Sequence, residues 1–84
     1  MTPDAILAVV RRHIEHPDLI ARLDVDASFS DLRLCGIDAW GIAVNIEDVL
    51  GRELDWRRVD TWCSVRDVVE TVAALGVLTD GLAA

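Results

Sequence analysis

The sequence predicts a small all-α domain. Apolar residues recur at helical spacing in three segments, near residues 3–15, 37–50 and 64–75. No segment alternates apolar and polar residues in the way that a half-buried strand does. A chain of 84 residues is long enough for one domain, so we expect residues 1–84 to form a single bundle.

The first helix is predicted to begin after Thr2 and to run to about Glu15. Thr2 supplies a hydroxyl N-cap, and Pro3 suits the first helical position. Apolar residues then follow at helical spacing: Ile6, Val10 and Ile14. Pro17 should end the helix, because a proline disfavours helical backbone in the residue before it.

A long connection follows, over residues 17–35. Its start is predicted to form a short helical turn with three apolar residues, Leu19, Ile20 and Leu23. The rest is acidic, and four apolar side chains should anchor it in the core: Val25, Phe29, Leu32 and Leu34. A connection of this length inside a compact domain is usually functional or packed by its own side chains.

The second helix is predicted over residues 37–50, with Gly51 as a left-handed C-cap. Its expected core stripe is Ile42, Ile46, Val49 and Leu50, flanked by Ile37, Trp40 and Val44. The segment RRVDTWC that follows should form one helical turn that buries Val59 and Trp62.

The last helix is predicted to begin after Ser64, with Asp67 completing a variant of the capping box. Apolar residues continue on one face of this helix: Val65, Val68, Val69, Val72 and Leu75. Gly76 should end it.

The chain is acidic, with 15 acidic residues, eight basic residues and a net charge of −7. All eight basic residues are arginines. Nucleic acid is therefore an unsuitable partner, and we expect partners with basic patches, although acidity also serves solubility alone. No apolar run approaches the ~20 residues of a membrane span, and the N-terminus lacks a signal-peptide pattern, so we expect a cytoplasmic protein.

Few residues suggest catalysis or metal binding. Cys35 and Cys63 have neither disulfide-framework nor metal-ligand spacing, so we expect free thiols, with a disulfide between them left open. Cys63, beside Trp62, is predicted to be a small core residue. His13 and His16 are predicted to lie at the surface rather than to bind a metal. Because no acid–base pair or phosphate-binding loop is present, we do not expect an enzyme.

The order of short motifs resembles the acyl carrier protein family. The match begins with FSDLRL at residues 29–34, continues with EDVLG at residues 47–51, and ends with SVRDVV at residues 64–69. The resemblance implies a four-helix bundle with three main helices, a short third helix, a long first loop and an internal apolar cavity. In that family, a serine at the start of the second helix carries a 4'-phosphopantetheine arm that holds acyl groups.

The chain departs from the family pattern at that serine. One register places Asp38-Ala39-Trp40 on the family's Asp-Ser-Leu, which leaves Gly51 only 12 residues after the attachment position. The other places Cys35-Gly36-Ile37 there and leaves Gly51 15 residues after it, which matches the family spacing without a gap. We therefore expect Gly36 at the attachment position, flanked by Cys35 and Ile37. Glycine has no oxygen to modify, so no cofactor is expected on this chain, although serine-containing relatives carry phosphopantetheine.

The resemblance implies a protein of fatty-acid, polyketide or specialised-lipid synthesis that cannot be loaded and acts in docking or regulation. Its partners would be acyl-chain-processing enzymes with basic patches, and it would be a monomer. The docking acids on the second helix would be Asp38, Glu47 and Asp48, unless these acids only solvate the helix. The resemblance also implies that Trp40 faces the cavity and reshapes it, with a plain core position as the alternative.

Three alternatives stay open. In the first, the chain is a serine-to-glycine variant of a genuine acyl carrier protein. In the second, it is an unrelated small helical interaction module. In the third, the thiol of Cys35 itself accepts acyl groups, although no histidine is placed by sequence to activate it.

Overall fold

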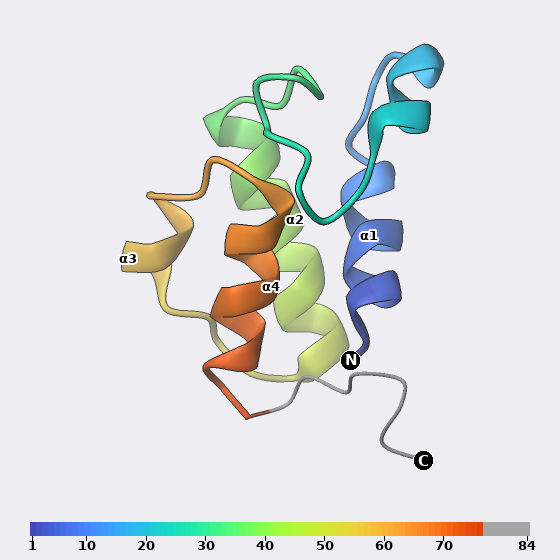
Figure 1. Cartoon of the computed structure of the whole chain (residues 1–84). Coiled ribbons are helices and arrows are strands. Elements are labelled where there is room, and N and C mark those ends of the chain that lie inside the picture. The colour runs from blue at the N-terminus through green and yellow to red at the C-terminus, as the bar shows by residue number, and fades with distance from the viewer. Residues whose placement is uncertain (77–84) are drawn as a thin grey trace.

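The computed structural model describes residues 1–76 and is all-α, as predicted (Figure 1). In chain order the elements are α1 (Pro3–Arg11), the 3₁₀ helix η1 (Pro17–Arg22), α2 (Gly36–Leu50), α3 (Trp56–Val59) and α4 (Val65–Ala73). The predicted short turns at the start of the long connection and before the last helix are thus confirmed as η1 and α3. Within the described residues, no helix has the length and apolar character needed to cross a membrane.

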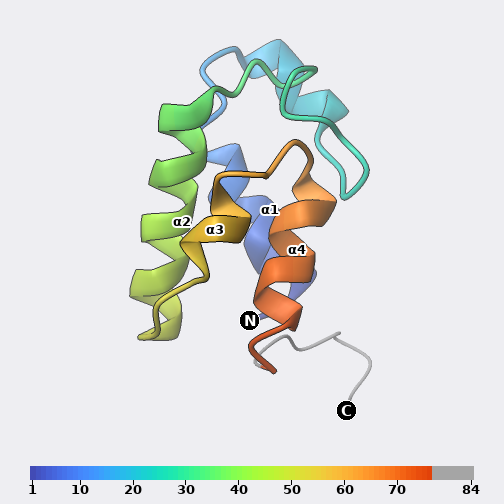
Figure 2. The same cartoon turned by 90° about the vertical axis from the view of Figure 1, so that its left-hand side faces the viewer.

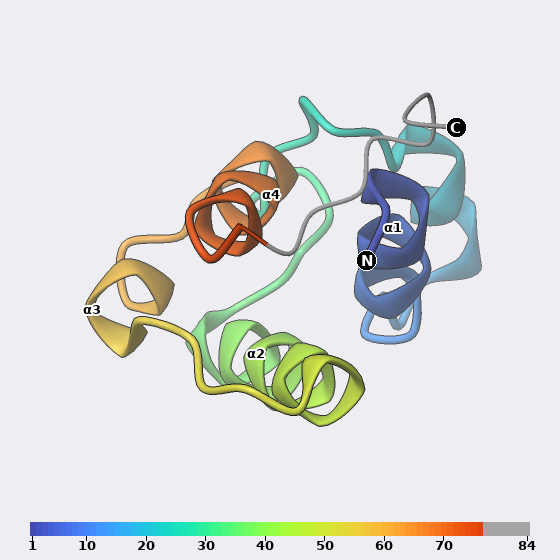
Figure 3. The same ribbon diagram turned by 90° about the horizontal axis from the view of Figure 1, so that it is seen from below.

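The three main helices surround one core. α1 packs against both α2 and α4, and the short α3 packs against the same two helices from the other side (Figures 2 and 3). α2 and α4 both begin at the end of the bundle where the long connection crosses (Figures 1 and 2). The connection therefore lies directly beside both helix starts.

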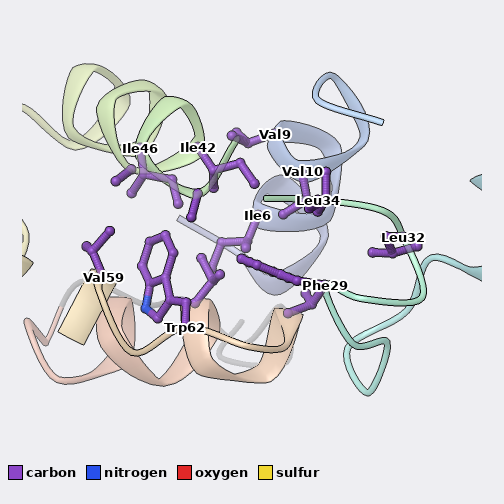
Figure 4. Close-up of a cluster of buried hydrophobic side chains, with 14 of the residues drawn as sticks. Ile6, Val9, Val10, Phe29, Leu32, Leu34, Ile42, Ile46, Val59 and Trp62 are labelled. Carbon is purple, nitrogen blue, oxygen red and sulfur yellow. The ribbon is translucent and has the colours of Figure 1, made fainter. Parts of the chain in front are cut away.

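Apolar side chains from every helix and from the connection meet in this core (Figure 4). Phe29 and Trp62 pack edge to face, with their ring centroids 6.5 Å apart. The indole N–H of Trp62 donates to Thr71 Oγ1 over 2.9 Å, and the Thr71 hydroxyl donates to the carbonyl of Asp67 over 2.8 Å. Thr71 is the one buried polar residue among residues 1–76, and both of its hydrogen bonds are satisfied within the core.

α1 ends earlier than predicted, at Arg11 rather than near Glu15. The N–H groups of the next three residues, including His13 and Ile14, bond to carbonyls three residues back, which tightens the chain into turns. Ile14 lies outside the helix, but its side chain is buried in the core.

α2 turns a different face to the core than predicted. Ile42 and Ile46 are fully buried as expected, but Val49 is 63% exposed. The core side of α2 is completed by two small residues, Ala39 and Ala43. The flanking residues Ile37, Trp40 and Val44 are all exposed. In the connection, Phe29, Leu32 and Leu34 are buried as predicted, whereas Val25 is only half-buried.

A glycine of α2, Gly41, lies close to the turn that follows α1. A Cβ at Gly41 would lie 2.7 Å from Cε1 of His13. The His13 ring is half-buried there, with its Nε2 2.8 Å from Nδ2 of Asn45. His16 is exposed as predicted, but His13 is half-buried, with its ring against α2.

Candidate functional site

The candidate site is the start of α2. Cys35 is the N-cap residue, and the Asp38 carboxylate accepts hydrogen bonds from the Cys35 N–H over 2.9 Å and from its thiol over 3.3 Å. The Cys35 carbonyl accepts from the N–H of Ala39 over 3.0 Å. At Gly36, an added Cβ would meet no atom within 4 Å, so no neighbour requires a glycine at this position.

A pocket of about 370 Å³ opens beside this helix start. It lies between the start of α2, the connection before it and the segment that joins α3 to α4. Its lining residues are Phe29, Ser30, Leu34, Cys35, Gly36, Ala39, Trp40, Val59, Asp60, Trp62 and Cys63. Of the three residues predicted around the attachment position, Cys35 and Gly36 line the pocket, whereas Ile37 does not.

Apolar side chains cover the outer face of α2. Ile37, Trp40 and Val44 are spaced three and four residues apart, so they lie on one side of the helix. Their exposed fractions are 81%, 56% and 48%. Trp56 of α3 packs edge to face on Trp40, with ring centroids 6.1 Å apart. These four residues are called the α2–α3 face below; contiguous exposed apolar groups of this kind are typical of interaction surfaces.

The three predicted docking acids differ in what they already bind. Asp38 is engaged by Cys35 at the helix start. Glu47 Oε2 accepts from the N–H of Leu54 over 2.8 Å and from the indole N–H of Trp56 over 3.1 Å. Asp48 is exposed and makes no hydrogen bond or ion pair with another residue in the described range 1–76. Glu47 therefore orients the α2–α3 face, and Asp48 is the acid whose charge is free.

Sequence reasoning missed one acid and one thiol at this site. Asp60 lines the pocket and accepts from the indole N–H of Trp40 over 3.4 Å. Cys63, predicted in the core, is exposed at the pocket rim. Its thiol bonds to Asp67 Oδ2 over 3.2 Å, and this hydrogen bond raises the pKa of Cys63. The neutral thiol is thus favoured, which is the opposite of nucleophile activation.

The described part of the chain holds no metal-binding group at this site. Both cysteines are free thiols, and neither histidine lines the pocket. Among residues 1–76, no three His, Cys, Asp or Glu side chains are placed to hold a metal ion together. The geometry provides a surface pocket of mixed polar and apolar lining beside the exposed start of α2, and an exposed aromatic surface next to it.

Comparison with known proteins identified no relative of this chain. No protein-family model matches the chain, and no match was found among curated proteins or solved structures. The resemblance to acyl carrier proteins therefore depends on the residues of this chain alone.

Proposed function

We propose that this chain is an acyl-carrier-protein-like binding module of fatty-acid, polyketide or specialised-lipid synthesis that is not loaded with phosphopantetheine. The observation that carries the proposal is the start of α2, where Gly36 is exposed, has open space around it and lines a pocket with apolar side chains in its wall. A carrier needs its attachment residue at such a place, because the arm must leave the protein while its cargo finds apolar shelter. Here that place holds a residue without a side chain.

Burial supports the register that puts Gly36 at the attachment position. In the other register, the attachment position is Ala39, which is only 5% exposed and belongs to the core. A serine hydroxyl there would be inaccessible to a transferase. Gly36, in contrast, is exposed and has space for a serine side chain.

The α2–α3 face is the docking surface of the proposal. Tryptophans often contribute most of the binding energy at interfaces, and here two of them are held in place by hydrogen bonds to Glu47 and Asp60. Asp48 lies on the same helix and adds an unpaired negative charge. A fitting partner is an acyl-chain-processing enzyme that presents an apolar depression with basic residues at its rim.

Incubation with coenzyme A and a broad-specificity phosphopantetheinyl transferase, read by intact mass, tests the proposal. We expect no adduct on the unmodified chain and a phosphopantetheine adduct on Gly36→Ser, if necessary combined with Cys35→Asp for transferase recognition. The matched control is Ala39→Ser, which should stay unmodified. An adduct on the unmodified chain, or on Ala39→Ser alone, would contradict the proposal.

The exposed aromatic face equally suits a helical interaction module that is unrelated to carriers. The same experiment separates the two functions. A folded Gly36→Ser/Cys35→Asp variant that no transferase modifies would favour the unrelated module. Loading of that variant would favour the carrier-like protein, either as a natural non-loadable form or as a serine-to-glycine variant of a genuine carrier.

A further inference from the structure

A second groove lies on the other side of the bundle, between α1 and η1. Its volume is about 690 Å³, and Figure 3 shows α1 and η1 on the side away from α3. The lining residues are Asp4, Leu7, Ala8, Arg11, Arg12, Ile20 and Leu23. Four of these residues belong to α1, and Arg12 is its C-cap residue; the five are spaced as one helix face, which points away from the side that buries Ile6, Val9 and Val10.

The charges along this groove are separated. Asp4 lies in the first turn of α1, Arg11 and Arg12 lie at its end, and apolar side chains occupy the space between. None of these three charged groups forms an ion pair or hydrogen bond with another residue in the range 1–76. Together they carry a net charge of +1, whereas the whole chain carries −7. The charge of this groove is therefore opposite in sign to that of the whole chain, which favours contact between two copies here.

The order of residues on this face is self-complementary. If a second α1 crosses the first antiparallel, about a two-fold axis between Leu7 and Ala8, then Asp4 of each copy faces Arg11 of the other. Leu7 of each copy then faces Ala8 of the other, and the small alanine permits a close approach of the helices. Seven residues of helix separate Asp4 from Arg11, or about 10 Å, so both ion pairs form at once.

We infer that the α1–η1 groove is the contact surface of a weak symmetric dimer. Each copy places its α1 against α1 and η1 of the other. α1 has only nine residues, so the interface falls at the small end of specific contacts, below about 1,200 Å². Dissociation constants of about 10 µM to 1 mM are expected for such a contact. The monomer expected from the sequence resemblance then dominates only in dilute solution, and the α2–α3 face stays free in the dimer.

Sedimentation equilibrium over a concentration series tests this inference. The weight-average mass of the unmodified chain should rise from 9.2 kDa toward twice that value as the concentration approaches about 1 mM. Asp4→Arg alone and Arg11→Asp/Arg12→Asp alone should each remove the rise, because like charges then face each other. An equimolar mixture of the two variants should restore it, since every facing pair is again opposite in charge.

Two further variants keep the result decisive. Asp48→Arg makes the same charge change as Asp4→Arg but on α2, and it should leave the rise in mass unchanged. Ala8→Arg keeps a good helix former at an exposed position and places a bulky cation near the proposed two-fold axis, so it should abolish the rise even if a charge-swap variant fails to fold. A constant mass for the unmodified chain, or unchanged association of folded Ala8→Arg, would overturn the dimer.

Discussion

α2 and α4 both begin beside a cysteine and an aspartate, but the two helix starts are built differently. At α4, Ser64 is the N-cap, and Asp67 Oδ2 accepts from the N–H groups of Cys63 and Ser64 and from the Cys63 thiol, over 2.9, 3.1 and 3.2 Å. At α2, the cysteine is itself the N-cap, and Asp38 serves Cys35 alone. At the start of α4, the carboxylate binds the backbone N–H groups of two residues, whereas at the start of α2 it binds the N–H of one residue.

The surroundings extend this difference. Around the start of α4, Phe29 donates to the carbonyl of Cys63 over 2.9 Å, and Val65 donates to the carbonyl of Ala27 over 3.0 Å. Around the start of α2, Gly36 and Ile37 are exposed, and the adjacent space is the pocket. The start of α4 thus holds the long connection in place, and the start of α2 remains accessible. The hydrogen bonds around the start of α4 stabilise the fold. The start of α2 has fewer such bonds and is open to a partner.

The largest expected contrast is between the two aspartates. Both helix starts have a capping box, but Asp67→Ala should lower the free energy of unfolding by about 2 kcal/mol, because it removes the acceptor of two backbone N–H groups. Asp38→Ala should lower it by only about 0.5 to 1 kcal/mol, since one exposed residue loses its acceptor. Urea unfolding followed by far-UV circular dichroism measures both values. Equal losses would mean that the two helix starts do not differ in the way described.

A smaller contrast concerns the N-cap residues. Ser64→Ala should cost about 1 kcal/mol, because the Ser64 hydroxyl accepts from the N–H of Asp67. Cys35→Ser should instead stabilise the protein by about 0.5 kcal/mol, because serine is a preferred N-cap residue and α2 lacks one. The same unfolding measurement applies. A loss of stability in Cys35→Ser would show that the thiol contributes more than a cap does.

Acid should affect the start of α4. Hydrogen bonds, first that from the Cys63 N–H, lower the pKa of Asp67 below the ordinary aspartate value of about 3.9. The folded state therefore binds this proton less readily than the unfolded state, so the stabilisation is fully present above about pH 4 and is lost as the pH falls below it. The melting temperature should fall between about pH 4 and pH 2, and less steeply in Asp67→Asn. An identical pH profile for the variant would exclude Asp67 as the cause.

The smallest effect should be seen in thiol chemistry. The hydrogen bond to Asp67 raises the pKa of Cys63, so removing the carboxylate should lower it and increase the thiolate fraction at a given pH. In a Cys35→Ser background, Asp67→Asn should react faster with a thiol reagent near neutral pH than the background variant does. An unchanged rate would show that the thiol and carboxylate do not interact in solution.

The parts predicted from sequence are those that depend on local chemistry. Thr2 caps α1, Ser64 and Asp67 form the capping box of α4, and Gly51 ends α2 with a positive φ of 66°. Each of these features is encoded within four residues of chain. The buried anchors Phe29 and Trp62 were also predicted, because large apolar residues in acidic or charged segments have few other places to lie.

The parts not predicted depend on packing between distant segments. α2 is apolar on more than one side, so periodicity could not decide that Ala39 and Ala43 face the core while Ile37 and Val44 face outward. The core side of α2 carries small residues. Because alanine is only weakly hydrophobic, the apolar pattern of the sequence does not identify this side as the buried one. Likewise, nothing within a few residues of Glu47 indicates that its carboxylate binds the indole of Trp56. The sequence identified Cys35 and Gly36 as site residues, and both line the pocket. It did not identify Cys63, which lines the opposite wall.

The arrangement of the three tryptophans gives the protein two separate optical reporters. Trp62 is buried and hydrogen-bonded to Thr71, whereas Trp40 and Trp56 are partly exposed and in mutual contact. Emission from Trp62 should lie at shorter wavelength and respond to unfolding. Emission from the Trp40–Trp56 pair should lie at longer wavelength and change when a partner removes water from the α2–α3 face. Single Trp→Phe replacements would assign each signal, so that folding and docking become measurable in the same unlabelled sample.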